Sequence, residues 1–150
     1  MDNINKKILN MLSEDASTST TEISAAVHLS VPAVNKRIRD MKDDETIRRF
    51  TVCTDPKKVG KPIVGFIFIV FRFRENMSDF FELIDRDADI LECYALTGEY
   101  DYMLKVCAES IEALENKLLG IKSQNGVERS HTMLALMEHK FKTAILPKED

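Results

Sequence analysis

The segment from Ile63 to Phe73, IVGFIFIVFRF, is apolar on both of the faces that a β-strand presents. Side chains alternate between the two faces of a strand, and here odd and even positions alike carry aliphatic or phenylalanine side chains. The segment between Met133 and Met137 has the same property, with methionines on one face and leucines on the other. A sheet built from such strands needs cover on both faces, which limits the folds open to this chain.

The patterns from residue 63 onward alternate between those of strands and helices. They predict, in order, strand 63–73, helix 76–87, strands 90–98 and 100–108, helix 110–126 and strand 127–140. We expect Ser78 to cap the first of these helices and Asn125–Gly126 to end the second. This order indicates an α+β chain with a split βαβ, ferredoxin-like domain (βαββαβ). Because two helices cover only one face of a four-stranded sheet, we expect the other face to pack on a second copy across a two-fold axis.

The first 44 residues predict three short helices, each with an apolar stripe at helical spacing. The segments are NINKKILNMLSED, with Asp2 or Asn3 as cap; STTEISAAVHLS, with a Ser/Thr cap and Glu22 in its first turn; and SVPAVNKRIRDMKDD, with Ser30 as cap. A short helix, a tight connection of three residues and a helix with a cationic outer face form the helix-turn-helix arrangement. The segment TIRRFTVCTD, residues 46–55, then predicts a strand that serves as a short wing.

The outer face of the third helix is the candidate nucleic-acid surface. Lys36 and Arg39 lie opposite the apolar stripe on a helical wheel, and Arg37 flanks that face. Arginine, lysine and asparagine can reach base edges in the major groove, and cations after the helix can contact phosphates. A basic helix face alone is more often solvated surface, so the order of the three helices carries the argument. The predicted DNA-binding residues are Ser30, Pro32, Ala33, Asn35, Lys36, Arg37, Arg39, Arg48 and Arg49.

Breaker residues in TDPKKVGKP, residues 54–62, coincide with a change in composition. We therefore predict a DNA-binding domain over 1–50, a hinge over 51–62, and a dimerisation and effector domain over 63–150. The net charge of −4 argues by itself against nucleic acid. Residues 1–60, however, carry 10 basic and 9 acidic residues, a balance of +1, and residues 61–150 carry 11 and 16, a balance of −5. A locally basic element on an acidic protein is compatible with a DNA reader.

Composition also excludes several other classes. With 44% hydrophobic and 31% charged residues, the chain is typical of soluble globular proteins. Its longest apolar run is too short to span a bilayer, and its N-terminus does not resemble a signal peptide. Three cysteines without a CxxC pair indicate reduced thiols rather than disulfides or a zinc site. We expect a cytoplasmic protein with no membrane contact, no metal and no cofactor apart from a possible amino-acid effector.

Three segments together resemble the Lrp/AsnC, or feast/famine, transcriptional regulators. LSVPAVNKRIRDMKDDETIRRFTVCTDPKKVG is similar to their DNA-binding segment and hinge, TGEYDYMLKV to their glycine–tyrosine–aspartate hairpin, and FKTAILP to their closing segment. The resemblance implies a winged helix-turn-helix, a hinge strand and a regulatory domain. It also implies dimers that assemble into tetramers or octamers, often with an amino acid bound between dimers. His28 and Glu45 stand where this family usually has glycine.

The resemblance places an amino-acid effector at the Gly98–Asp101 hairpin. Asp101 would hold the ammonium, backbone N–H groups near Gly98 the carboxylate, and Tyr100 the side chain, with Glu99 beside them. The last strand of a neighbouring dimer would complete the pocket through Ser130 and Thr132, and more weakly through His131. The competing interpretation is structural, with Gly98 forming a turn and Asp101 accepting hydrogen bonds from backbone amides.

Two alternatives to a ligand-tuned regulator were open at this point. One is an architectural protein that wraps DNA without an effector. The other is an enzyme like the sirohaem decarboxylases, which resemble this family, but we predict no catalytic residues. His131 and His139 are eight residues apart on one predicted strand, about 26 Å, too far to share a small site within one subunit.

Overall fold

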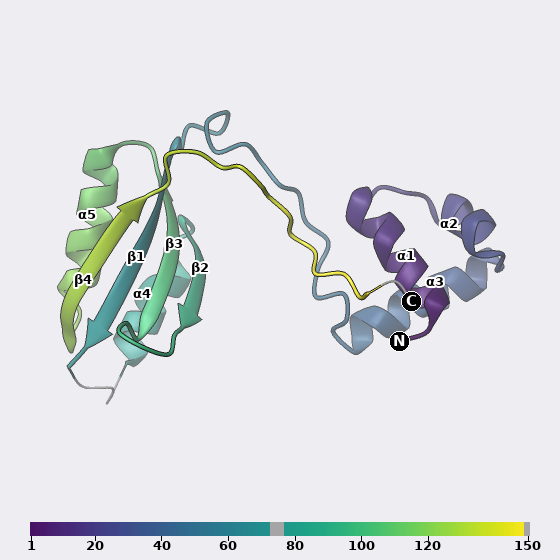
Figure 1. Ribbon diagram of the computed structural model, residues 1–150, viewed down its shortest axis with the longest axis horizontal. Helices are drawn as coiled ribbons and strands as arrows, with labels where there is room; N and C mark the ends of the chain where they lie inside the picture. Colours follow the sequence, from purple (N-terminus) through teal and green to yellow (C-terminus); the bar gives the residue numbers. More distant parts are fainter. Residues whose placement is uncertain (73–76, 149–150) are drawn as a thin grey trace. The chain divides into compact units, whose positions relative to one another are not determined.

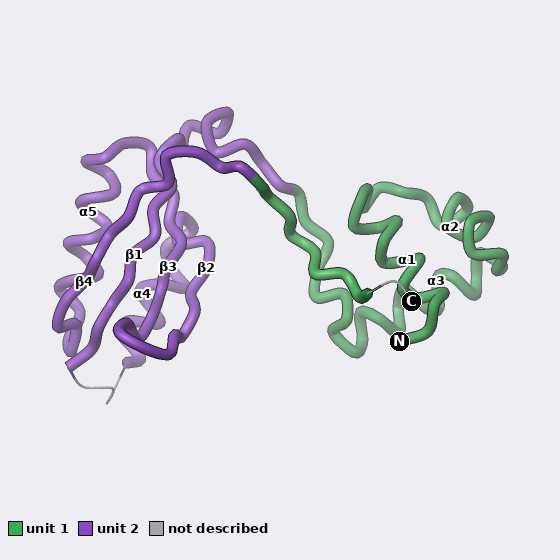
Figure 2. The backbone as a smooth tube through the Cα atoms, in the orientation of Figure 1, with its two compact units in different colours: residues 1–52, 140–150 green, residues 53–139 purple. Residues whose placement is uncertain are grey.

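The computed structural model describes residues 1–72 and 77–148, which form two compact units (Figure 2). One unit comprises residues 1–52 together with the segment that starts at Lys140, and the other comprises residues 53–139. Each unit has its own core of buried apolar side chains. Phe73 and Asn76, which belong to the predicted strand and the helix after it, lie outside the described residues.

Three helices form the first unit: α1 (Asn3–Glu14), α2 (Thr20–Val27) and α3 (Val31–Asp43) (Figure 1). Each helix begins at a predicted cap. The Asp2 carboxylate accepts from the Asn5 N–H at 2.7 Å, Ser19 and Glu22 form a reciprocal capping box, and Ser30 caps α3. Such caps satisfy backbone N–H groups that have no partner inside the helix, so short polar residues decide where these helices start.

The core of the helical unit is contributed by all three helices. Its fully enclosed side chains follow the predicted stripes: Ile8 from α1, Ile23 and Val27 from α2, and Val34 and Met41 from α3. Partly buried apolar residues such as Ile4, Leu12 and Ile38 surround them. The stripe of each helix therefore points inward, which leaves the opposite face of α3 exposed.

His28 resolves the tight turn between α2 and α3. Its backbone is left-handed, with φ 55° and ψ 42°, the conformation that the family usually gives to glycine. This geometry lets the Leu29 N–H donate to the Ser24 carbonyl at 3.2 Å, and Leu29 packs against the helical core. The Ser24 hydroxyl in turn donates to the Leu29 carbonyl at 2.6 Å. Histidine thus occupies the turn as we expected, because the local hydrogen bonds hold it there.

Glu45 also adopts a left-handed backbone, with φ 59°, just after α3. The chain then turns so that the Ile47 N–H donates to the Met41 carbonyl at 2.7 Å. The predicted wing strand over 46–55 was wrong for the isolated chain, since residues 48–55 have no regular secondary structure. A strand requires a neighbour that exchanges backbone hydrogen bonds, and residues 48–54 make none with the described backbone of this chain.

The second unit is a four-stranded antiparallel sheet with the order β2-β3-β1-β4, which confirms the ferredoxin-like prediction. Its elements are β1 (Ile63–Phe71), α4 (Ser78–Arg86), β2 (Ile90–Ala95), β3 (Tyr102–Ala108), α5 (Ile111–Lys122) and β4 (Val127–Leu134). The central strand β1 pairs with both β3 and β4 (Figure 1).

The two faces of β1 have different environments. Its odd-numbered residues Ile67, Ile69 and Phe71 are buried in a core with Phe80 of α4 and Leu114 of α5. Its even-numbered residues lie on the other face, which we call the open face, and remain partly exposed: Val64, Phe66, Phe68 and Val70. Met133 of β4, paired with Phe66, is 47% exposed on the same face. The prediction that two helices leave one apolar face uncovered within the chain is therefore confirmed.

Three element boundaries differ from the sequence prediction. β4 ends at Leu134 rather than near residue 140, so His139 lies outside the strand and the spacing argument for two histidines on one strand was wrong. Met77, not Ser78, occupies the capping position of α4. α5 ends at Lys122, because Ser123 caps it before the left-handed Gly126 is reached. Within the described residues, no helix is long and apolar enough to cross a membrane.

We expect Glu45→Gly to raise the free energy of unfolding of the helical unit by about 1 kcal/mol, since glycine adopts left-handed backbone without the steric cost that a Cβ imposes. Thermal denaturation followed by circular dichroism measures the effect. Glu45→Ala is the control, because alanine removes the charge and keeps the Cβ, so it should give no gain. Equal stabilisation by both variants would assign the effect to charge rather than to backbone strain.

Candidate nucleic-acid interface and hairpin site

The exposed face of α3 carries the predicted polar and cationic residues. Asn35, Lys36 and Arg39 are exposed, while Val34 and Met41 on the opposite side are buried. Pro32 is also exposed in the first turn, and Ala33 is partly buried next to it. The fold therefore presents these side chains outward from a helix whose inner face is fixed by packing.

The cations on this face differ in how far they are already neutralised. Lys36 forms an ion pair with Asp40 at 2.7 Å, with 73% and 55% of the side chains exposed. Such exposed pairs contribute little and break at small cost. Arg39 has no ion pair with any described residue. Arg39 is thus the cation on this face most available to an anionic partner.

Arg37 occupies a different place from its neighbours on α3. Its guanidinium bonds to the Asp2 carboxylate at 2.5 Å and to the Asn5 side-chain oxygen at 2.8 Å. The Asn5 N–H and then the Arg37 guanidinium lower the pKa of Asp2 from its ordinary value. In this structure Arg37 fastens α3 to the start of α1. Its wheel position beside the outer face did not reveal a partner 35 residues away.

Arg48 and Arg49 are exposed in the segment that follows α3. Neither arginine has an ion pair within the described part of the chain. The neighbouring Phe50 ring lies 4.8 Å from the Lys42 ammonium, a cation–π contact that links this segment to the end of α3. Two further cations therefore follow the exposed helix in an extended segment.

The hairpin between β2 and β3 is held together by Asp101. Gly98 has φ 109°, a conformation that favours glycine, and the Leu96 N–H donates to the Asp101 carbonyl at 2.8 Å. Asp101 Oδ2 accepts from the Phe71 N–H at 2.8 Å, and the Asp101 N–H donates to the Ile69 carbonyl at the same distance. The carboxylate thus fastens the hairpin to the end of β1, as the structural interpretation of this motif predicts.

Tyr100 lies within a group of side chains on the open face, which we call the hairpin cluster: Phe68, Glu99, Tyr100, Arg129 and His131. The Tyr100 ring is 5.1 Å from the Phe68 ring and stacks at 26° on His131 with 6.3 Å between centroids. The Arg129 guanidinium lies over Tyr100 at 5.6 Å and pairs with Glu99 at 3.3 Å. An aromatic surface therefore lies next to an exposed cation and an exposed anion.

Ser130 and Thr132 lie on the other side of β4. They pair with Ile69 and Ile67, whose side chains are buried on the helix-covered face. Their hydroxyl oxygens are buried and have no hydrogen-bond partner among the described residues. They do not face Tyr100 within the subunit, because strand alternation gives that place to Arg129 and His131. Our sequence analysis missed Phe68 and Arg129 as neighbours of Tyr100, since the pairing of β1 with β4 sets them.

The hollows of the sheet unit lie away from this cluster. One of about 290 Å³ is lined by the end of α4 and by β2, and a second of about 600 Å³ is lined by residues of α4 with Gln124. Neither hollow is lined by a residue of the hairpin cluster. The cluster is therefore an exposed surface in a single chain, and it encloses a ligand only when another surface covers it.

Two family models match most of the chain. A model described as the AsnC-type helix-turn-helix domain matches residues 1–42. A model described as the Lrp/AsnC ligand binding domain matches residues 66–145. The two matches correspond to the helical unit and to the sheet unit with the segment that follows it.

Characterised relatives match over nearly their full length. The HTH-type transcriptional regulator FL11 of Pyrococcus horikoshii is 32% identical over 145 residues, 97% of this chain and 95% of that protein. The transcriptional regulator AzlB of Bacillus subtilis is 34% identical over 139 residues, 89% of this chain and 88% of that protein. A solved complex of a Neisseria meningitidis transcriptional regulator with L-methionine has a TM-score of 0.89 and 26% identity, covering 97% and 96% of the two chains.

Proposed function

The chain belongs to the Lrp/AsnC family of DNA-binding transcriptional regulators, and we propose that it reads double-stranded DNA through the outer face of α3. The observation that carries the proposal is the unpaired, exposed Arg39 beside Asn35 and Lys36 on a helix whose inner face is buried. In a helix-turn-helix the second helix enters the major groove, where these side chain types reach base edges. Arg48 and Arg49 follow as phosphate contacts.

The proposal divides the α3 segment into contacts and supports. Ser30, Pro32 and Ala33 place the N-terminus of the helix, whose free N–H groups favour a backbone phosphate. Arg37 acts through Asp2 by fixing the angle between α3 and α1. The division of labour follows the domains: residues 1–50 read DNA, residues 51–62 form the hinge, and residues 63–150 assemble the protein and bind the effector.

We further propose that the open face packs on the open face of a second copy. Val64, Phe66, Phe68 and Met133 form an apolar surface there that water would otherwise cover. Two sheets packed face to face across a two-fold axis bury this surface on both copies at once. The dimer places two copies of α3 on one DNA, and pairs of dimers form tetramers or octamers.

The effector site proposed here is the hairpin cluster. An amino acid carries an ammonium, a carboxylate and a side chain, and Glu99, Arg129 and the Tyr100 ring offer a complementary anion, cation and apolar wall. The Gly98 backbone allows close approach. Asp101 keeps the hairpin in shape, and the buried Ser130 and Thr132 are left out of the contact set. The L-methionine complex of the Neisseria relative supports an amino acid as the ligand class. Binding between dimers then changes the assembly and with it the operator affinity.

The DNA-reading proposal predicts that Lys36→Ala with Arg39→Ala weakens binding to a duplex selected by the parent protein by about tenfold or more. Any phosphate contact among the lost pairs lowers the slope of log affinity against log salt by about one. Fluorescence anisotropy at several salt concentrations measures both quantities. The control, Arg86→Ala with Lys122→Ala, removes two cations from α4 and α5 and should leave affinity near that of the parent. Equal affinity of parent and α3 variant would exclude this face as the reader.

The dimer proposal predicts that the parent sediments well above the 17.1 kDa of one chain. Phe66→Glu places a charge in the middle of the open face and should give a monomer, because an unpaired buried charge is costly. Leu119→Glu is the matched control, since Leu119 is 57% exposed on α5. Analytical ultracentrifugation at micromolar concentration distinguishes these cases. A monomeric parent would contradict the proposal outright.

The effector proposal predicts that Glu99→Gln and Arg129→Met each weaken amino-acid binding by about tenfold or more, since each removes a charge-assisted hydrogen bond. Isothermal titration of the parent with the twenty amino acids, beginning with L-methionine, identifies the ligand for the comparison. Glu128→Gln, the exposed neighbour on the other face of β4, should bind like the parent. Unaltered binding in both test variants removes the ion pair from the site, and no binding by the parent favours an effector-free architectural role.

A further inference from the structure

The end of the hinge is a folded turn rather than a loose connection. Between Asp55 and Lys61, the Lys58 and Val59 N–H groups both donate to the Asp55 carbonyl, at 3.0 and 3.2 Å. The Lys61 N–H donates to the Pro56 carbonyl at 2.8 Å, and Gly60 has φ 79°, which lets the chain reverse. We call this segment the hinge turn. It immediately precedes β1, which starts at Ile63.

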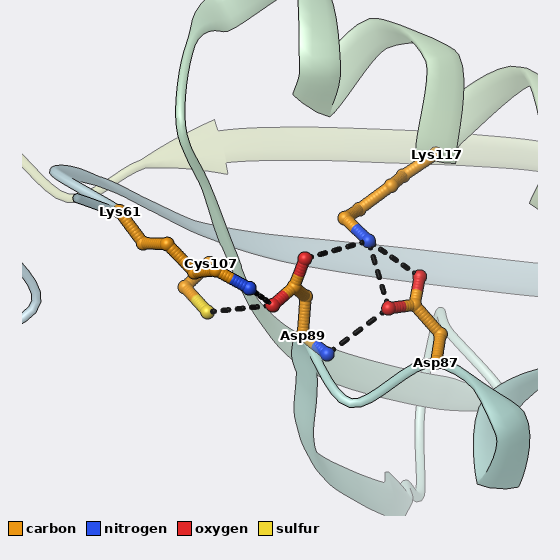
Figure 3. A network of polar contacts seen from close by, with 5 residues as sticks. All are labelled: Lys61, Asp87, Asp89, Cys107 and Lys117. Atoms are coloured by element: carbon orange, nitrogen blue, oxygen red, sulfur yellow. Dashed lines mark hydrogen bonds and ion pairs between the residues drawn. The ribbon is translucent and has the colours of Figure 1, made fainter. Parts of the chain in front are cut away.

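The Lys61 ammonium at the end of the hinge turn enters a network of four charges (Figure 3). It forms a hydrogen-bonded ion pair with Asp89, between α4 and β2. Lys117 of α5 pairs with Asp87 at 2.6 Å and with Asp89 at 3.1 Å. The Asp89 backbone is itself fixed, because its carbonyl accepts from the Cys107 N–H of β3 at 2.9 Å. Lys61 is thus tied to a carboxylate that α5 and β3 already hold in place.

The network is partly shielded from water. The four side chains are between 18% and 31% exposed, in contrast to the Lys36–Asp40 pair on α3 with 73% and 55%. Screening by solvent and salt is weaker for such groups, so their pairing stabilises more than that of surface pairs. Among the described residues, the Lys61–Asp89 contact is the only hydrogen bond or ion pair that joins the hinge turn to the rest of the sheet unit.

We propose that Lys61, acting through Asp89, is a positioning residue for DNA recognition: it holds the hinge turn against the sheet unit and so shortens the free tether of the DNA-reading helices. This inference rests on the proposed DNA-reading function. With the hinge turn docked, residues 48–54 are the free span, seven residues that reach at most about 25 Å. With the turn released, the free span runs over residues 48–61 and doubles in length.

A longer tether lowers the effective concentration of the second reader once the first has bound. For flexible tethers this concentration falls roughly as the −3/2 power of length, so a doubling costs up to about threefold in affinity for DNA with two half-sites. Affinity for DNA with one half-site does not depend on the tether. The separation between the two half-sites should also be tolerated over a wider range when the tether is longer.

The test compares Lys61→Met with Lys58→Met in the full chain. Lys58 lies in the same turn, is exposed and has no ion pair with a described residue, so its substitution controls for a lost cation near DNA. The probes are a duplex with two half-sites selected by the parent from random sequence, the same duplex with its spacing changed stepwise, and a duplex with one half-site. Hydrogen exchange of the 55–62 peptide reports whether the turn is released, independently of DNA.

We expect Lys61→Met to speed exchange of the 55–62 peptide, to lower two-site affinity up to about threefold and to broaden spacing tolerance, with one-site affinity unchanged. Lys58→Met should match the parent in all four measurements. Unchanged exchange in Lys61→Met overturns the inference, as does faster exchange with unchanged spacing tolerance, and so does an equal loss on one-site and two-site DNA. If the parent binds no DNA, the proposed function fails and the positioning role with it, whereas the other negative outcomes leave DNA binding intact.

Discussion

Burial of one face of β1 is the interaction on which the rest of this protein depends. Ile67, Ile69 and Phe71 are enclosed by α4 and α5, which fixes the central strand and the register of both its neighbours. The same strand has apolar residues on its other face, and no helix is left in the sheet unit to cover them. Folding of the unit therefore creates the surface through which it associates, because apolar area that remains in water favours assembly.

The elements decided by local chemistry could be predicted from the sequence. Asp2, Ser19 and Ser30 start their helices because a short polar side chain satisfies free N–H groups nearby in sequence. The order of strands and helices gave the sheet topology because few arrangements bury such strands. The wing could not be predicted, since residues 46–55 have strand-like composition but no ladder partner in the chain. Partner availability is a property of the assembled fold.

The site residues divide along the same line. Exposure of Lys36 and Arg39 followed from helical periodicity, which needs no knowledge of other elements. The position of Arg37 depended on Asp2, far away in sequence, and wheel geometry says nothing about such a partner. The neighbours of Tyr100 depended on a one-residue choice of register between β1 and β4, which exchanges the two faces of a strand. Sequence therefore identified the hairpin but not the side chains around it.

The charges of the two halves assign DNA binding to the helical unit more firmly than α3 does alone. Residues 61–150 carry a balance of −5, so phosphates are repelled by the sheet unit, while residues 1–60 carry +1. Within the helical unit, Asp40 offsets Lys36 and Asp2 offsets Arg37, which leaves Arg39, Arg48 and Arg49 as cations without an ion pair to a described residue. A small excess of positive charge concentrated at the end of one helix and in the segment after it orients the protein on a duplex. Repulsion elsewhere keeps its non-specific affinity low, and that contrast lets base contacts decide where the protein binds.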